Sequence, residues 1–181
     1  DTLLDNNAYN ATISGDGTIT AFSSQATNVV ANDTNGDIDV FTRENFGSNI
    51  DRVSVSSFEG QGTGTSDNAS ISDDGRYVAF GSASLLAGGF PGGAFNVYIR
   101  DRTAGTTELV NVKSDETLGD AGGGGAELSG SGRYVAFSSD ATNLVSGDTN
   151  GQRDVFVRDR TAGTTVRVSL SDADAQLPTG A

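Results

Sequence analysis

The chain has 181 residues, enough for one domain with its own buried core, and its 25 glycines among many Ser, Thr, Asn and Val residues favour short strands joined by turns. Its formal net charge is −13, and 19 of the 24 acidic residues are aspartate. This charge, without any cluster of basic residues, excludes nucleic acid as an expected partner. The first expectation is therefore an all-β protein with an acidic surface.

Several residue types are missing from the sequence. Without His the chain cannot form a Ser-His-Asp or Cys-His triad, and without Cys it cannot form a disulfide or a thiolate zinc site. We therefore expect no enzymatic activity from these residues. No apolar run approaches transmembrane length, so no membrane insertion is expected. The lack of Met predicts either a processed mature protein or a fragment.

One unit of sequence occurs three times. The copies are ATISGDGTITAFSS (residues 11–24), ASISDDGRYVAFGS (69–82) and AELSGSGRYVAFSS (126–139). Their turn glycines, Gly17, Gly75 and Gly132, are 58 and 57 residues apart. Each copy continues into a second shared block, which reads IDVFTRENFGSNIDRVSVS, NVYIRDRTAGTTELVNVKS or RDVFVRDRTAGTTVRVSLS. A period of this size is typical of solenoids, arrays and propellers.

The local pattern predicts four strands within each repeat. In the second repeat they are expected at 69–72, 76–82, 96–101 and 106–112, with Gly75 at a positive-φ turn position. Tyr77 and Ala79 alternate with Val78 and Phe80, so the two sets should face opposite sides of the sheet. Four consecutive antiparallel strands form a meander, which is one blade of a β-propeller.

The repeat resembles the TolB-like, WD-repeat-like β-propeller repeats of bacteria. The likeness rests on the pattern I-S-x-D-G-R-Y-V-A-F-x-S, then D-V-F-V-R-D-R, then G-T-T-x-R-V-S. It implies blade 1 at about residues 9–57, blade 2 at about 67–114 and blade 3 at about 124–171, with inter-blade connections or cut ends at 1–8 and 172–181. It also implies an extracytoplasmic location, either periplasmic, cell-surface or secreted.

Three blades are fewer than the four to eight that close an ordinary propeller. The chain is therefore expected either to be part of a larger propeller or to be completed by an oligomer. Its expected partners are another protein or copies of itself, bound through the open blade edges.

Two loops carry an acidic motif, NDTNGDIDVF at residues 32–41 and GDTNGQRDVF at 147–156. Oxygen-bearing side chains at alternate positions around a glycine are similar to the first half of a calcium-binding loop. The candidate calcium ligands are Asp33, Asn35, Asp37 and Asp39 in blade 1, and Asp148, Asn150, Gln152 and Asp154 in blade 3. The alternative is that Asp-x-Asn-Gly is simply a favoured turn. The corresponding loop of blade 2, SASLLAGGFPGGAFNVY, contains no acid, so the motif is an addition to the blade.

Calcium would act by ordering these loops, because it would neutralise carboxylates that repel each other in a segment expected to have no hydrophobic anchor. The arginines at the ends of the third strands, which are Arg100, Arg102, Arg158 and Arg160, are expected to form solvated ion pairs. The aromatic residues Tyr77, Tyr134, Phe22, Phe80 and Phe137 are expected to pack between blades.

The favoured function is a non-catalytic, extracytoplasmic, calcium-binding β-propeller module that serves as an interaction or assembly scaffold, for example as a surface or filament subunit. One alternative is the propeller domain of a larger secreted hydrolase or peptidase. Another is a carbohydrate-binding propeller that recognises a surface glycan, although the chain has no Trp.

Overall fold

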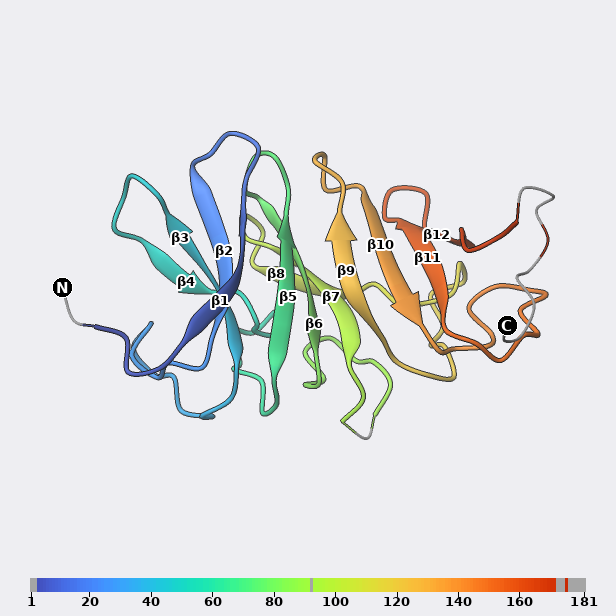
Figure 1. Ribbon diagram of the computed structural model, residues 1–181, viewed down its shortest axis with the longest axis horizontal. Coiled ribbons are helices and arrows are strands. Elements are labelled where there is room, and N and C mark those ends of the chain that lie inside the picture. The colour runs from blue at the N-terminus through green and yellow to red at the C-terminus, as the bar shows by residue number, and fades with distance from the viewer. Residues whose placement is uncertain (1–2, 92, 172–174, 176–181) are drawn as a thin grey trace.

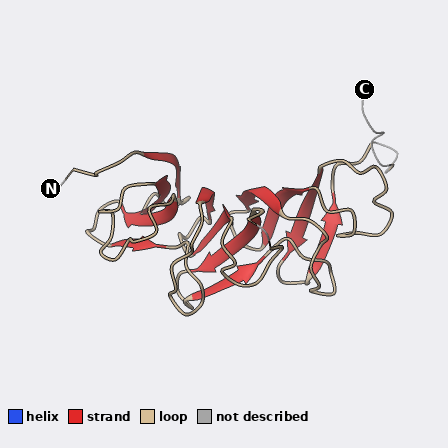
Figure 2. Cartoon of the chain, turned by 90° about the horizontal axis from the view of Figure 1, so that it is seen from below, coloured by secondary structure: helices blue, strands red, loops and turns tan. Residues whose placement is uncertain are grey.

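The computed structural model describes residues 3–91, 93–171 and 175, and these residues form twelve strands and no helix (Figures 1 and 2). The strands make three separate four-stranded antiparallel sheets. Each sheet takes its four strands from one continuous stretch of chain, and the strands lie in sequence order. The prediction of three four-stranded blades is thus confirmed.

The strands have the following bounds. Blade 1 contains β1 (Ala8–Ile13), β2 (Ile19–Ser24), β3 (Asp39–Glu44) and β4 (Ile50–Arg52). Blade 2 contains β5 (Ser66–Ile71), β6 (Tyr77–Ser82), β7 (Asn96–Asp101) and β8 (Thr106–Leu109). Blade 3 contains β9 (Gly123–Leu128), β10 (Tyr134–Ser139), β11 (Asp154–Asp159) and β12 (Thr164–Arg167). The expected end segment 172–181 lies outside the described residues, apart from residue 175.

The three blades stand side by side in chain order, with β1–β4 at one end of the molecule and β9–β12 at the other (Figure 1). The first strands of neighbouring blades are in contact, β1 with β5 and β5 with β9. We call the face that a blade turns toward its predecessor the leading face, and the face toward its successor the trailing face. Blade 2 is covered on both faces, whereas among the described residues no blade lies against the leading face of blade 1 or the trailing face of blade 3.

Two apolar cores fill the spaces between blades. The core between blades 1 and 2 is built from Ile19, Ala21, Val40, Val53, Ile71, Val78, Phe80, Leu86 and Tyr98. The core between blades 2 and 3 is built from Ala79, Val97, Ile99, Val110, Ala126, Val135, Phe137, Ala141, Leu144 and Phe156. Alternating residues of β6 enter different cores, as the sequence predicts, because successive side chains of a strand point to opposite faces.

The hairpin between the first and second strands is held by its own side chains. In blade 2 the hydroxyl of Ser72 donates to the Asp74 carboxylate at 2.6 Å and accepts the backbone N–H of Tyr77 at 2.9 Å. Gly75 has φ +69°, which confirms the predicted left-handed turn position. The same arrangement recurs in blade 1 with Ser14 and Asp16.

The expected bounds of the first and fourth strands were wrong. β5 begins at Ser66 rather than 69, because the strand continues through a bulge in which Asn68 adopts φ 57°. β8 ends at Leu109 rather than 112, because Val112 leaves the ladder to form an isolated bridge with Leu118.

The expectation of solvated arginines was wrong for Arg100 and Arg158, which are buried and connect blades. The Arg100 guanidinium forms an ion pair with Glu59 of the preceding blade and donates to the Ser56 carbonyl at 3.2 Å. Arg158 repeats both contacts with the connection that follows blade 2. These arginines therefore anchor each blade to the turn that leaves the previous one.

Candidate functional site

The acidic loop of blade 1 is organised around an arginine. Asp39 begins β3 and Arg52 ends the neighbouring strand β4, so the two side chains meet at the mouth of the loop. The Arg52 Nη1 lies 3.1 Å from Asp39 Oδ2 and 3.2 Å from Asp33 Oδ1. Its Nη2 donates to the backbone carbonyl of Asn32 at 3.0 Å. One guanidinium thus bridges two of the four residues predicted to bind calcium.

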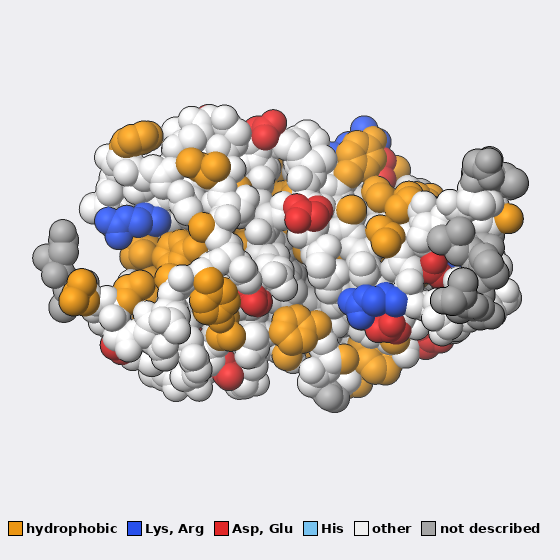
Figure 3. All heavy atoms as spheres, viewed as in Figure 1, with side chains coloured by type: hydrophobic (Ala, Val, Ile, Leu, Met, Phe, Trp, Pro, Cys, Tyr) orange, Lys and Arg blue, Asp and Glu red, His pale blue; other side chains and the backbone are white. Residues whose placement is uncertain are grey.

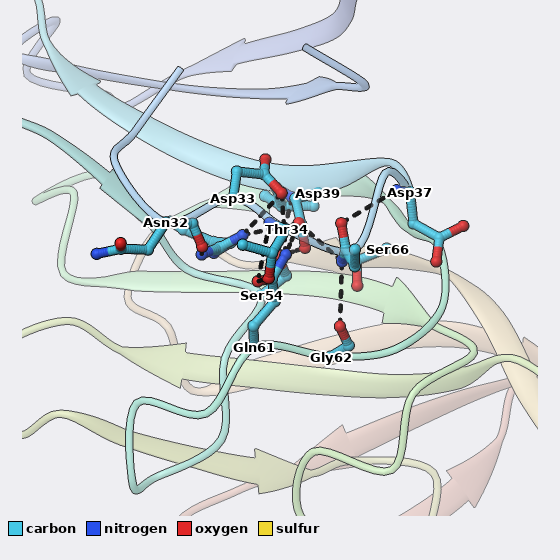
Figure 4. Close-up of polar contacts among 12 residues, drawn as sticks. Asn32, Asp33, Thr34, Asp37, Asp39, Ser54, Gln61, Gly62 and Ser66 are labelled. Atoms are coloured by element: carbon cyan, nitrogen blue, oxygen red, sulfur yellow. Dashed lines mark hydrogen bonds and ion pairs between the residues drawn. The ribbon is translucent and has the colours of Figure 1, made fainter. Parts of the chain in front are cut away.

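Neutral donors complete this cluster. The hydroxyl of Ser54 donates to Asp39 Oδ1 at 2.6 Å, and the side-chain amide of Asn35 donates to Asp39 Oδ2 at 3.1 Å. Gln61, in the turn that follows β4, donates to Asp33 Oδ1 at 2.9 Å and to Asp39 Oδ2 at 3.3 Å (Figure 4). Asp39 is fully buried, so these N–H and O–H groups replace the water that a carboxylate requires.

The other two predicted ligands of blade 1, Asn35 and Asp37, do not turn an oxygen toward the carboxylates of Asp33 and Asp39. Asn35 turns its amide nitrogen, not its oxygen, toward Asp39, because the oxygen accepts the backbone N–H of Asp37 at 3.0 Å. The Asp37 carboxylate points away from Asp33 and Asp39 (Figure 4). This part of the motif is an Asx turn with Gly36 at φ +69°, as the alternative interpretation of the sequence expects.

Blade 3 repeats the bridge. Arg167 Nη1 lies 3.0 Å from Asp148 Oδ1 and 3.4 Å from Asp154 Oδ2, and the Ser169 hydroxyl donates to Asp154 Oδ1. Asn150 accepts the backbone N–H of Gln152 at 3.0 Å, so the same turn forms.

Asp148 is the least satisfied member of this second cluster. Apart from the ion pair with Arg167, neither of its buried carboxylate oxygens has a hydrogen-bond partner among the described residues. In the sequence, the position that corresponds to Gln61 is Gln176, which lies outside the described residues.

Blade 2 replaces the whole cluster at once. Asn96, Leu109, Asn111 and Leu118 stand at the positions of Asp39, Arg52, Ser54 and Gln61. The Asn111 side chain donates to Asn96 at 3.3 Å and accepts the backbone N–H of Val97 at 2.8 Å. In blade 1 the Ser54 hydroxyl accepts the corresponding N–H, that of Val40. The acids and the arginine are therefore present together or absent together, which is the behaviour of one interacting unit.

Burial and mutual repulsion act on the carboxylates that share an arginine. Burial raises the pKa of Asp33, the charge of Asp39 raises it further, and Arg52 opposes both. Burial likewise raises the pKa of Asp148, with Arg167 lowering it and Asp154 raising it. A single guanidinium thus leaves each loop with excess negative charge.

The described residues suit an arginine-bridged carboxylate pair better than an oxygen cage. Calcium takes six to eight oxygen ligands, whereas the oxygens of Asp33 and Asp39 already accept bonds from nitrogen and hydroxyl donors. Within the part of the chain that the structure describes, no three acidic side chains lie close enough to hold a metal ion. Calcium binding by the eight predicted ligands stays a prediction.

The loops also have hydrophobic anchors, which contradicts the expectation that these segments have none. In blade 1, Ala26 and Val29 are buried against Phe41. In blade 3, Ala141 and Leu144 belong to the core between blades 2 and 3. Apolar packing therefore holds the base of each loop.

Sequence reasoning missed the arginines, serines and glutamine of these clusters. The signal was available, because Arg52 and Arg167 occupy one position of the aligned repeats and Leu109 replaces them in the repeat whose loop lacks acids. The sequence does not show the contact directly, since 13 residues separate Arg52 from Asp39 and only the strand register brings them together.

Comparison with solved structures identifies the fold. A putative TolB from Agrobacterium tumefaciens matches with a TM-score of 0.56 and 16% identity over 92% of this chain and 50% of that one. The β-propeller domain of the trilobed protease from Pyrococcus furiosus matches with a TM-score of 0.52 and 10% identity over 89% and 41% of the two chains. The oligogalacturonate lyase of Vibrio parahaemolyticus matches with a TM-score of 0.53 and 16% identity over 92% and 42%.

The chain is built from β-propeller blades. At these identities the likeness shows the fold alone, and the chain spans half or less of the length of each of the three proteins. No protein-family model and no curated protein sequence matches the chain. The described residues contain no helix that is long and apolar enough to cross a membrane.

Proposed function

We propose that the chain is a non-catalytic, extracytoplasmic β-propeller module that serves as an interaction or assembly scaffold. The observation that supports this proposal is the trailing face of blade 3. In blades 1 and 2 the residues at the corresponding strand positions are buried by the blade that follows. Apolar residues that are exposed on this face, and buried at the same positions of the other blades, indicate a surface for a binding partner.

The exposed fractions of equivalent residues show the difference. Val155 is 40% exposed, whereas its counterpart Val97 in blade 2 is fully buried. Val168 is 50% exposed, and its counterpart Val110 is 2% exposed. Tyr134, expected in the core, is also exposed, because no blade among the described residues covers it. Hydrophobic side chains reach the surface over the region of β9 and β10 in the space-filling view (Figure 3).

Footprinting would test whether this face is covered when the protein functions. Carbene labelling of the purified chain at low concentration should mark Tyr134, Val155 and Val168. In cells that produce the chain, the same residues should be protected several-fold, while Phe58, which lies on an exposed turn, should label equally in both settings. Equal labelling of the blade 3 face in both settings would refute the scaffold proposal.

Calcium binding by the acidic loops is a separate part of the proposal, supported by the excess of carboxylates over arginine in each loop. Calcium at a hundredfold excess over its Kd should stabilise the folded chain by about 2.7 kcal/mol relative to chelator. Thermal unfolding of wild type, Asp37→Asn and the exposed control Asp140→Asn measures this effect. The Asp37→Asn variant should lose part of the response, and a wild-type midpoint that ignores calcium would contradict metal binding.

We propose no catalytic role, because the sequence offers neither His nor Cys as a base or nucleophile. The lyase and protease structures share only the fold with this chain. Binding of a surface glycan stays a prediction.

A further inference from the structure

The two internal interfaces share an ion pair at their outer rim. Asp51 of blade 1 lies 3.6 Å from Arg102 of blade 2, and Glu108 of blade 2 lies 3.1 Å from Arg160 of blade 3. In each case the acid belongs to the trailing face of one blade and the arginine to the next blade. The pair is therefore a repeated element of blade-to-blade contact.

Both halves of this pair are absent at the open faces. The strand register places Val166 of blade 3 where blades 1 and 2 carry Asp51 and Glu108. On blade 1 the position of Arg102 and Arg160 is taken by Asn45.

Backbone contacts confirm that these positions correspond. The Asn45 side chain donates to the Gly17 carbonyl at 2.8 Å, just as Arg102 donates to the Gly75 carbonyl at 2.8 Å and Arg160 to that of Gly132 at 2.7 Å. The acid and the arginine are thus both absent from the two faces without a neighbour.

The leading face of blade 1 also exposes residues that a neighbour buries elsewhere. Ile13 is 58% exposed, whereas its counterpart Ile71 in blade 2 is 7% exposed. Arg43 corresponds to the buried Arg100 and Arg158, yet it is exposed and has no carboxylate partner within the described residues. Blade 1 therefore has the features of a blade that follows another.

We propose that the two open faces bind each other between two copies of this chain, the trailing face of blade 3 packing on the leading face of blade 1 in both directions. This inference rests on the scaffold function proposed above and names its partner. Contact between Val166 and Asn45 leaves no charge buried without a partner, whereas an arginine at the position of Asn45 would face an apolar surface. Two copies with three blades each make a six-bladed ring, within the usual range of about four to eight, and three copies would exceed it.

The first test is the mass of the 181-residue chain in solution. Analytical ultracentrifugation over a range of concentrations should show a dimer of twice 18.4 kDa, with no larger species. Val168→Lys should raise the dissociation constant at least tenfold, because it places a charge in the interface. The matched control Phe58→Lys, which changes an exposed apolar residue outside both faces, should leave it unchanged. Circular dichroism verifies that both variants fold.

The second test is a charge pair transplanted across the interface. Val166→Asp and Asn45→Arg should each weaken the dimer at least tenfold when present alone. Mixing the two single variants should restore association, since one interface of the mixed dimer gains the internal acid–arginine pair and the other is wild type. A merely structural effect of either substitution would not be rescued in this way.

A wild-type chain that stays monomeric at every concentration would overturn the proposal, as would open polymers, a dimer that tolerates Val168→Lys, or failure of the mixed rescue. If the chain is monomeric but the blade 3 face is protected in cells, the scaffold function stands and its partner is another protein. If the face is neither protected in cells nor used in a dimer, both proposals fail.

Discussion

At the scale of single residues, Arg52 determines how the acidic loop of blade 1 is held. It lies between two buried carboxylates, and a buried charge without a partner is destabilising. Blade 2 shows that the fold does not need this charge cluster, because an amide pair takes its place there. The cluster is therefore stable as a unit, and removal of one member should lower the free energy of unfolding.

Arg52→Leu introduces the residue that blade 2 carries at this position and leaves Asp33 and Asp39 buried without a cation. We expect a loss of about 3–5 kcal/mol in the free energy of unfolding, measured by urea denaturation. Arg153→Leu removes an exposed ion pair with Asp140 and should cost no more than about 1 kcal/mol. Similar small losses in both variants would show that the Arg52 cluster contributes little.

The candidate site could be predicted only in part from its residues. The repeated motif identifies Asp33 and Asp39 as interacting acids, and the structure brings them together. The motif cannot show that Asn35 turns its side-chain nitrogen toward Asp39. The orientation of an amide follows from the donors and acceptors around it. The role of Arg52 likewise depends on a strand register that the motif does not contain.

At the scale of secondary structure elements, a side-chain clasp joins β6 and β7. The Arg76 guanidinium donates to both Asp101 oxygens, from Nε at 3.0 Å and from Nη2 at 2.6 Å. The backbone N–H groups of Thr103 and Ala104 also donate to Asp101. These bonds, with that of Arg76 the strongest, lower the pKa of Asp101 from 3.8 to about 2.

This depressed pKa predicts a specific acid sensitivity. The folded state binds the Asp101 proton more weakly than the unfolded state, so the clasp contributes its full stability above about pH 4 and loses it as the pH falls toward 2. Urea unfolding between pH 5 and pH 2 should show a shallower loss of stability in Asp101→Asn than in wild type. Asp140→Asn is the control, and an identical pH dependence in wild type and Asp101→Asn would contradict the clasp.

The elements themselves were largely predictable. The spacing of the turn glycines and the alternation within β6 identify the strands, since both follow from backbone geometry within a few residues. The bulge in β5 was missed, although Asn10, Asn68 and Gly125 occupy one position in the three repeats and all have positive φ. Asn and Gly tolerate a positive φ better than other residues, so their recurrence at this position could have indicated the bulge.

At the scale of the whole molecule, the apolar pattern of a repeat cannot distinguish a covered blade from an open one. Val40, Val97 and Val155 occupy the same position in three similar repeats, yet only Val155 is exposed. Burial here depends on the presence of a neighbouring blade, which the local pattern does not encode. The contacts that join blades, such as Arg100 with Glu59, also link residues far apart in the chain.

The middle blade should be the most resistant to local opening. β7 lies between two apolar cores, whereas β11 is covered on its leading face only. In a repeat protein, stability is the sum of each repeat and its interfaces, so the amides of β11 should exchange at least tenfold faster than those of β7. Native-state hydrogen exchange measures this ratio, at a concentration low enough for the proposed dimer to dissociate. Equal protection would mean that all three blades open as one unit.

Each blade takes its four strands from one continuous stretch, and among the described residues no strand pairs with a sheet of another blade. A ring made from two such chains would therefore have no shared backbone ladder across its seams. Its halves could separate and rejoin while every sheet stayed intact, because neighbouring blades are joined only by side-chain contacts and by isolated backbone hydrogen bonds, such as that from the Asp16 N–H to the Asp73 carbonyl at 3.0 Å. Such a ring would exchange subunits readily between assemblies, and dilution rather than unfolding would control its lifetime.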